Sequence, residues 1–265
     1  MDGFVSAVLK ILAFLLSLIM AVIGFFRGGT NPEDPTVTAT ATSAVVTAKP
    51  DDPSVPQPTG TEDDTGEGTT VTEVSKTTSS FSVDLKDNGI SIICTTETYY
   101  SQGAEIKKVF SARYTSGGRT YGNSVTFIKN SSGGYNLQSD STINTILTTT
   151  NGYRAEVGVT ALKLDYKDTC AAMFRAAAMA ACCDMDHNTP GASFSDAINL
   201  FDISFNTAAE NIAYQKNLSD ESVCEGWKNS SGHYSNIIDG RLALTGIGYA
   251  VGSDGATYYA QVFTG

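Results

Sequence analysis

Three side chains with acid–base chemistry stand out in the C-terminal half of the sequence. Glu210 lies inside the apolar run that ends at Ile212, where an ionised carboxylate needs a partner. The chain has only two histidines, His187 and His233, so they are the candidate partners. Two imidazoles and a carboxylate that meet in a cleft could act as a general base toward water. They could also hold a divalent metal such as Zn²⁺, with the two histidines as ligands and Glu210 as a third ligand or as the hydrogen-bond acceptor of a ligand. We therefore take His187, Glu210 and His233 as the candidate catalytic residues.

The same residues allow two other interpretations. In the first, Glu210 accepts hydrogen bonds from a histidine and from backbone N–H groups, and it only pins loops over a sheet. In the second, Ser230 or Ser231 is a nucleophile activated by His233, although no GxSxG turn surrounds either serine. Trp227, the only tryptophan of the chain, is expected to be a core anchor rather than a ligand-stacking side chain.

Helices and a β-hairpin must position these side chains. An Ala-rich stretch, 166–185, predicts a helix, and His187 then lies just past its end. The other expected elements are a helix from Ser141 that stops at Gly158, two short helices after Ser193 and Ser219, and a hairpin of strands 245–251 and 257–263.

The order of these elements and their motifs resembles the CAP superfamily, named for cysteine-rich secretory proteins, antigen 5 and plant pathogenesis-related proteins. The resemblance covers residues 141–265, and the compact loop between Trp227 and His233 is similar to that of bacterial members. It is carried by motifs that start at Asn151 (Asn-Gly-Tyr-Arg), His187, Ala209 (Ala-Glu-Asn-Ile-Ala), Ser230 (Ser-Ser-Gly-His-Tyr-Ser-Asn-Ile-Ile), Gly246 (Gly-Ile-Gly-Tyr) and Tyr258 (Tyr-Tyr-Ala-Gln-Val-Phe).

The resemblance implies an α+β fold, an α-β-α sandwich with a central antiparallel sheet. It also implies a cleft lined by two histidines and one or two glutamates, which His187, Glu210 and His233 match. Many animal and plant members have a second glutamate about three residues past the tryptophan, and this chain has Ser230 there. The missing acid favours a structural or binding role for the cleft over a catalytic one.

The sequence upstream of this domain divides into three segments. Residues 1–27 contain the uncharged apolar run 11–26, which residues 4–9 extend to the ~20 residues of a membrane span if the Lys10 side chain reaches the membrane surface. We therefore expect a transmembrane signal anchor, or a signal peptide if it is cleaved. Residues 28–80 are rich in Thr, Pro and acids, which predicts a disordered linker. Residues 81–140 hold short β-type runs parted by Gly-containing turns, which predicts a small antiparallel β module.

Charge and cysteine content exclude several classes of protein. The chain carries 28 acids and 17 bases, a net charge of −11, with no basic stripe, which argues against a nucleic-acid partner. Its five cysteines form no CxxC pair, so we expect neither a disulfide-built scaffold nor a zinc–thiolate site, and buried free thiols instead.

These features predict a bacterial protein of the cell surface that is tethered to the membrane through its N-terminal helix, or secreted if that helix is removed. Members of the resembled superfamily bind sterols or lipids, interact with proteins or are proposed peptidases, so the resemblance alone does not decide the function. We expect a binding or interaction module at the cell envelope whose ligand is a wall component, a lipid or a protein. The alternative is a hydrolase of a peptide or wall substrate, either metal-assisted or with a His/Glu general base.

Overall fold

The computed structural model describes residues 74–86 and 89–265, together with the backbone of a short strand at 38–42. The predicted membrane anchor, 1–27, lies outside the described residues, as does most of the predicted linker, 28–80. Within the described part of the chain, no helix is long and apolar enough to cross a membrane.

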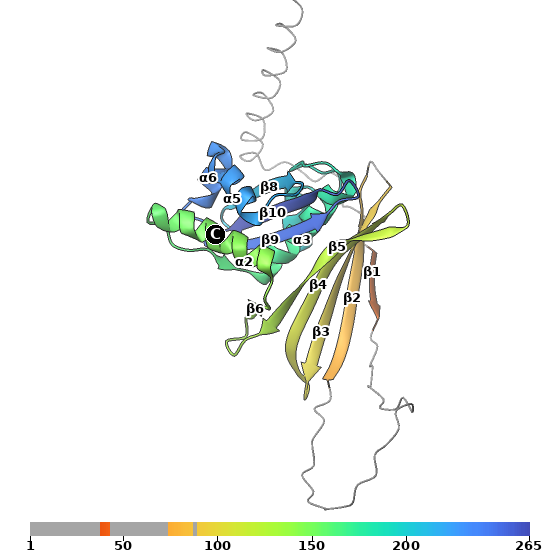
Figure 1. Ribbon diagram of the computed structural model, residues 1–265. Helices are drawn as coiled ribbons and strands as arrows, with labels where there is room; N and C mark the ends of the chain where they lie inside the picture. The colour runs from red at the N-terminus through yellow and green to blue at the C-terminus, as the bar shows by residue number, and fades with distance from the viewer. Residues whose placement is uncertain (1–37, 43–73, 87–88) are drawn as a thin grey trace, which may run out of the picture. The chain divides into compact units, whose positions relative to one another are not determined.

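The first sheet is an antiparallel meander of strands in the order β1-β2-β3-β4-β5-β6 (Figure 1). The strands are β1 Thr38–Thr42, β2 Val74–Asp84, β3 Ser91–Ser101, β4 Ala104–Ser116, β5 Arg119–Lys129 and β6 Tyr135–Leu137. Strand β2 begins at Val74, inside the segment predicted to be a linker, and pairs with β3 along its whole length. Backbone groups supply the ladder hydrogen bonds, so the Ser- and Thr-rich start of β2 pairs as well as its apolar end.

The second sheet has the order β7-β9-β10-β8. Its strands are β7 Lys163–Leu164, β8 Ala208–Gln215, β9 Leu244–Val251 and β10 Thr257–Thr264. The three long strands are antiparallel, and the hairpin β9–β10 is the one predicted from the sequence. The central sheet is thus antiparallel, as expected, with one addition at its edge, where the short strand β7 runs parallel to β9. Strand β8, which carries Glu210, forms the other edge.

Five helices accompany this sheet in the described residues. They are α2 Ser141–Glu156, α3 Tyr166–Cys182, α4 Phe194–Leu200, α5 Asp220–Lys228 and α6 Ser231–Ile237. Helix α3 packs on one face of the sheet, against β9 and β10, and α2, α5 and α6 lie on the other side (Figure 1). The arrangement is therefore an α-β-α sandwich in the α+β class.

Two details of the helices differ from the sequence predictions. Helix α3 ends at Cys182 rather than at residue 185, because Cys183 adopts the left-handed conformation (φ 50°) and its N–H donates to Ala180 O. The segment after Trp227, expected to be a loop, forms helix α6 and contains His233. His187 does lie past the end of α3, as predicted.

Close packing of α3 on the sheet depends on small residues. A Cβ atom at Gly246 would clash with the backbone of Asp168, and one at Gly248 would clash with the backbone of Ala172. The alanines of α3 are all buried. The helix and the sheet therefore approach backbone to backbone, which fixes the position of every side chain that α3 presents.

The two sheets contribute to one hydrophobic core within the compact unit Thr36–Gly265. The Tyr114 hydroxyl of β4 donates to Ala180 O of α3 (3.0 Å), and Phe110 of β4 packs edge-on against Phe201 just after α4 (5.5 Å between ring centroids). Cys94, Cys170 and Cys224 are buried free thiols, as predicted, whereas Cys183 is exposed, contrary to that prediction. Burial raises the pKa of Cys224 to about 12.

Candidate functional site

Glu210 is buried on the face of β8 that points to α3, and its partner is an arginine. The Arg175 side chain is 0% exposed and that of Glu210 is 1% exposed. Arg175 Nε donates to Glu210 Oε1 (2.7 Å), and Arg175 Nη2 donates to Oε2 (3.3 Å). The sequence pointed to the histidines and to backbone N–H groups as partners of Glu210, and the pairing with Arg175 was not predicted. A signal was present, because Arg175 is the only charged residue between Asp168 and Asp184 in an Ala-rich helix.

Arg175 also fixes the segment that carries His187. Its guanidinium donates to the carbonyl oxygens of Ala192 and Asp186, the second at 2.6 Å from Nη2. The carbonyl of His187 in turn accepts from Phe194 N–H at the start of α4 (2.9 Å). One buried cation thus ties the segment between α3 and α4 to the carboxylate on β8.

His187 completes this cluster. Its Nδ1 lies 2.7 Å from Glu210 Oε2, and its side chain is 48% exposed. Burial acts to raise the pKa of Glu210, but the hydrogen bond from His187 and the charge and hydrogen bond of Arg175 outweigh burial and lower it. The carboxylate is therefore ionised and can only accept, so Nδ1 of His187 carries the donated proton. In the neutral imidazole, Nε2 then keeps its lone pair.

His233 occupies a different environment on α6. Its carbonyl accepts from Asn211 Nδ2 (3.1 Å), and Asn236 Nδ2 donates to Asn211 Oδ1 (2.9 Å), so two asparagines join α6 to β8. Asn236 is therefore part of a hydrogen bond between helix α6 and strand β8. Burial and the nearby His187 lower the pKa of His233, which makes its imidazole neutral at neutral pH.

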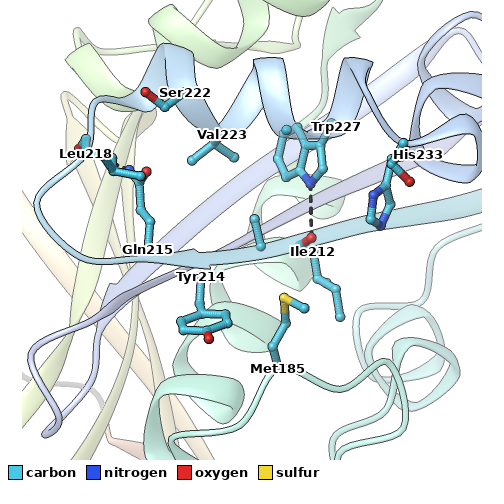
Figure 2. Close-up of a pocket in the computed structure, with 12 residues that line it drawn as sticks. Met185, Ile212, Tyr214, Gln215, Leu218, Ser222, Val223, Trp227 and His233 are labelled. Atoms are coloured by element: carbon cyan, nitrogen blue, oxygen red, sulfur yellow. Dashed lines mark hydrogen bonds between the residues drawn. The ribbon is translucent and has the colours of Figure 1, made fainter. Parts of the chain in front are cut away.

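A pocket of about 340 Å³ lies along β8 and includes His233 (Figure 2). The lining is mostly apolar and comes from the end of β8, the loop after it, α5, the start of α6 and the segment after α3: Met185, Ile212, Ala213, Tyr214, Gln215, Leu218, Ser222, Val223, Gly226, Trp227, Ser230 and His233. Trp227 is 2% exposed and donates from Nε1 to Ile212 O (3.0 Å), so it is a core anchor that also forms part of the pocket wall.

The predicted site residues thus divide between two neighbouring places. Glu210 and His187 belong to the buried cluster with Arg175, and His233 belongs to the pocket wall. Ser230 stands where many animal and plant members of the superfamily have a second glutamate, and it also lies in the pocket wall. Ser231 is the first residue of α6. Asn211, Tyr214 and Gly226 help to build this region and were not singled out from the sequence.

The residues do not fit a metal centre built on Glu210. Within residues 74–86 and 89–265, no three or more His, Cys, Asp or Glu side chains form a group that could hold a metal ion. Both oxygens of Glu210 already accept hydrogen bonds from Arg175, and one accepts from His187 as well. The Arg175 guanidinium thus supplies the positive charge that a metal ligated by Glu210 would have supplied.

Comparison with known proteins agrees with this architecture. Residues 147–263 match the CAP family, described as the cysteine-rich secretory protein family. The uncharacterized protein YkwD of Bacillus subtilis (strain 168) is 32% identical over 118 residues, which are 44% of each chain, so this chain matches less than half of that relative's length. Similar solved structures include an outer surface protein of Borrelia burgdorferi (TM-score 0.44, 18% identity, 49% of this chain and 97% of that one). They also include an extracellular protein with an SCP domain from Bacillus anthracis (TM-score 0.42, 14% identity, 69% and 87%). Residues 147–263 of this chain therefore match the CAP family, as the sequence motifs indicated.

Proposed function

We propose that this chain is a binding module that acts outside the cytoplasm at a bacterial cell envelope, and that the pocket beside His233 receives its ligand. The observation that carries the proposal is the pocket itself. Its volume of about 340 Å³ lies in the range of small-molecule and peptide-side-chain sites, and its lining combines apolar walls with a few polar groups. The matched family is named for secretory proteins, which agrees with the apolar run predicted to be a signal anchor or signal peptide.

The chemistry of the neighbouring cluster also favours binding over turnover. The charge of Glu210 is compensated by Arg175, and the carboxylate is closed to solvent. A carboxylate in this state stabilises the fold and orients His187, but its own proton affinity is too low for it to act as an acid near pH 7. The neutral imidazole of His233 can donate a hydrogen bond to a ligand in the pocket or accept one from it. Because this imidazole carries no net charge, ligand binding does not incur the free-energy cost of removing a charge from water.

Trp227 gives a direct test, because it is the only tryptophan of the chain and it lines the pocket. Full-length protein in detergent is titrated with solubilised peptidoglycan, and the emission of Trp227 is followed. We expect a saturable change in the wild type. Gly226→Leu places a side chain into the pocket without a clash, because no atom lies within 4 Å of a Cβ at this position. We expect this variant to bind at least about tenfold more weakly.

Gly152→Leu is the matched control for this experiment. Gly152 is also an exposed helical glycine with open space around a Cβ, but it lies on α2 and does not line the pocket. Both substitutions raise helix propensity by about the same amount. Equal affinity of the two variants would refute the pocket as the binding site.

A second candidate function, hydrolysis, is supported by the bond between His187 Nδ1 and Glu210 Oε2 (2.7 Å). This contact holds the imidazole in the tautomer in which Nε2 can take a proton from water. In this interpretation, His187→Gln abolishes release of soluble products from peptidoglycan or peptide substrates while the protein stays folded. Release of product at the wild-type rate by His187→Gln would remove the general-base candidate.

A further inference from the structure

We propose that the ligand of this pocket is an extended polypeptide segment that pairs with the outer edge of β8 at Tyr214, places one apolar side chain in the pocket and carries basic residues on either side. This inference rests on the proposed function, because it names the ligand class of the same pocket. It joins three observations: the direction of the backbone groups of β8, the shape of the apolar wall and the local charge.

The backbone of β8 has a defined inner and outer side. Thr207 N–H donates to Gly265 O (3.1 Å) and Gly265 N–H donates to Thr207 O (3.0 Å), so Thr207 points its backbone groups into the sheet. The direction alternates along an antiparallel strand. The groups of Glu210, Ile212 and Tyr214 therefore point outward, away from β10.

Side chains from the helices occupy two of these outward positions. Trp227 Nε1 donates to Ile212 O (3.0 Å), and Asn236 Nδ2 approaches Glu210 O (3.5 Å). Tyr214 is the next outward residue, and it lines the pocket. Its ring stacks on the ring of its cross-strand partner Tyr258 (5.9 Å between centroids), so the ring lies over the neighbouring strand β10 and not over the outer edge of β8. An exposed strand edge of this kind is a template for a further strand.

The apolar wall provides a place for a side chain of such a strand. Val223 and Trp227 form its buried part, and Leu218 (65% exposed), Met185 (40%) and Tyr214 (57%) form its rim. In Figure 2, Val223 and Trp227 lie on the α5 side of β8 and Met185 lies on the other side. Large apolar side chains gathered at the rim of a pocket are a mark of a binding surface.

The charges beside the pocket favour a basic ligand. Asp184 and Asp186 flank Met185 in the sequence and are exposed. Lys216, the neighbour of Gln215, is compensated by Asp254 (3.8 Å). The whole chain carries a net charge of −11. Basic residues on either side of the apolar side chain would therefore be attracted to this edge.

The test uses the capped pentapeptide Lys-Val-Leu-Val-Lys and the emission of Trp227 in the full-length protein. Two further peptides carry N-methyl groups, one on both valines and the other on the leucine. In a paired strand only alternate N–H groups face β8, so we expect one methylated peptide to bind at least about tenfold more weakly and the other to keep its affinity within about threefold. Equal affinity of the two methylated peptides, or no binding of the parent peptide, would overturn strand pairing.

A pair of protein variants isolates the N–H group of Tyr214. Tyr214→Ala removes the ring and keeps the N–H, and Tyr214→Pro removes both. Proline is tolerated on an edge strand where its nitrogen points outward. We expect the proline variant to bind the pentapeptide about threefold to tenfold more weakly than the alanine variant, with unchanged circular dichroism. If the proline variant does not fold, the methylated peptides decide the question.

Two controls separate this inference from the proposed function. The peptide Glu-Val-Leu-Val-Glu is expected to bind more weakly than the lysine peptide at low salt, and equal binding would overturn the charge argument. Oleate serves as an apolar ligand that has no peptide groups and cannot pair with a strand. If oleate or peptidoglycan changes the emission of Trp227 and no peptide does, the pocket binds ligands but the peptide inference is wrong.

Discussion

The buried cluster of Arg175, Glu210 and His187 and the pocket beside His233 lie next to each other on β8, but they differ in the charge of their side chains. In the cluster, the charges of Arg175 and Glu210 are paired inside the protein, and the partly exposed His187 donates to the same carboxylate. The pocket beside His233 has no charged side chain in its wall, and Tyr214 of the edge strand β8 lines it. The ion pair of Arg175 and Glu210 is closed to solvent, whereas the rim of the uncharged pocket is exposed.

This difference changes how the histidines and Glu210 are understood. In the sequence, these three residues suggested a catalytic or metal-binding centre, because clusters of histidine and glutamate often form such centres. In the structure, Glu210 instead pairs with Arg175, and His233 lies in the mostly apolar wall of the pocket. A perturbed carboxylate can thus belong to a structural ion pair, with the ligand site beside it on the same strand.

The largest expected effect comes from breaking the cluster. Glu210→Leu leaves the fully buried guanidinium of Arg175 without its counter-charge, so we expect a loss of about 3–5 kcal/mol in the free energy of unfolding, measured in urea by circular dichroism. The double variant Arg175→Met with Glu210→Leu removes both charges and should lose less than the single variant. A single variant within about 1 kcal/mol of wild type would show that the pair does not hold the fold.

Acid unfolding gives the next effect, with a defined sign. Folding lowers the pKa of Glu210, so its contribution to stability is fully present above the unfolded pKa of about 4.3 and is lost as the pH falls through the lower folded value. We expect the stability of wild type to drop below about pH 4 more steeply than that of Glu210→Gln. Parallel curves of unfolding free energy against pH would contradict the lowered pKa.

The smallest effect concerns the two imidazoles. The chain has two histidines, so proton NMR resolves each titration. We expect the pKa of His233 to lie below about 6.5 and to rise in His187→Gln, since His187 contributes to its lowering. Folding stability should also fall slightly as the pH drops below about 6.5, because the unfolded His233 binds a proton more readily. A pKa of His233 that does not respond to His187→Gln would place the two rings in separate environments.

Local patterns in the sequence predicted much of this domain. The Ala-rich helix, the capping box at Ser193 and Asp196 and the final hairpin depend on residues close in the chain, and the structure has them. Family motifs also brought Glu210 and His187 together correctly. These features can be predicted without knowing how the helices and strands pack against one another.

Tertiary packing decided what the sequence did not show. The pairing of Arg175 with Glu210 depends on α3 lying on glycines of β9, and Tyr114 of the first sheet reaches α3 across 66 residues of sequence. The outward direction of Tyr214 follows from the register of β8 on β10, which no periodicity within β8 specifies. The pocket is therefore a property of the assembled sheet edge, although its histidine and tryptophan were visible in the sequence.

One measurement compares the two regions directly. The affinity for solubilised peptidoglycan is determined from Trp227 emission in Gly226→Leu, which fills the pocket, and in His187→Gln, which removes the exposed member of the cluster. If the pocket is the binding site, Gly226→Leu binds at least about tenfold more weakly and His187→Gln stays within about threefold of wild type. Loss of binding in His187→Gln with normal binding in Gly226→Leu would place the function in the cluster and contradict the account.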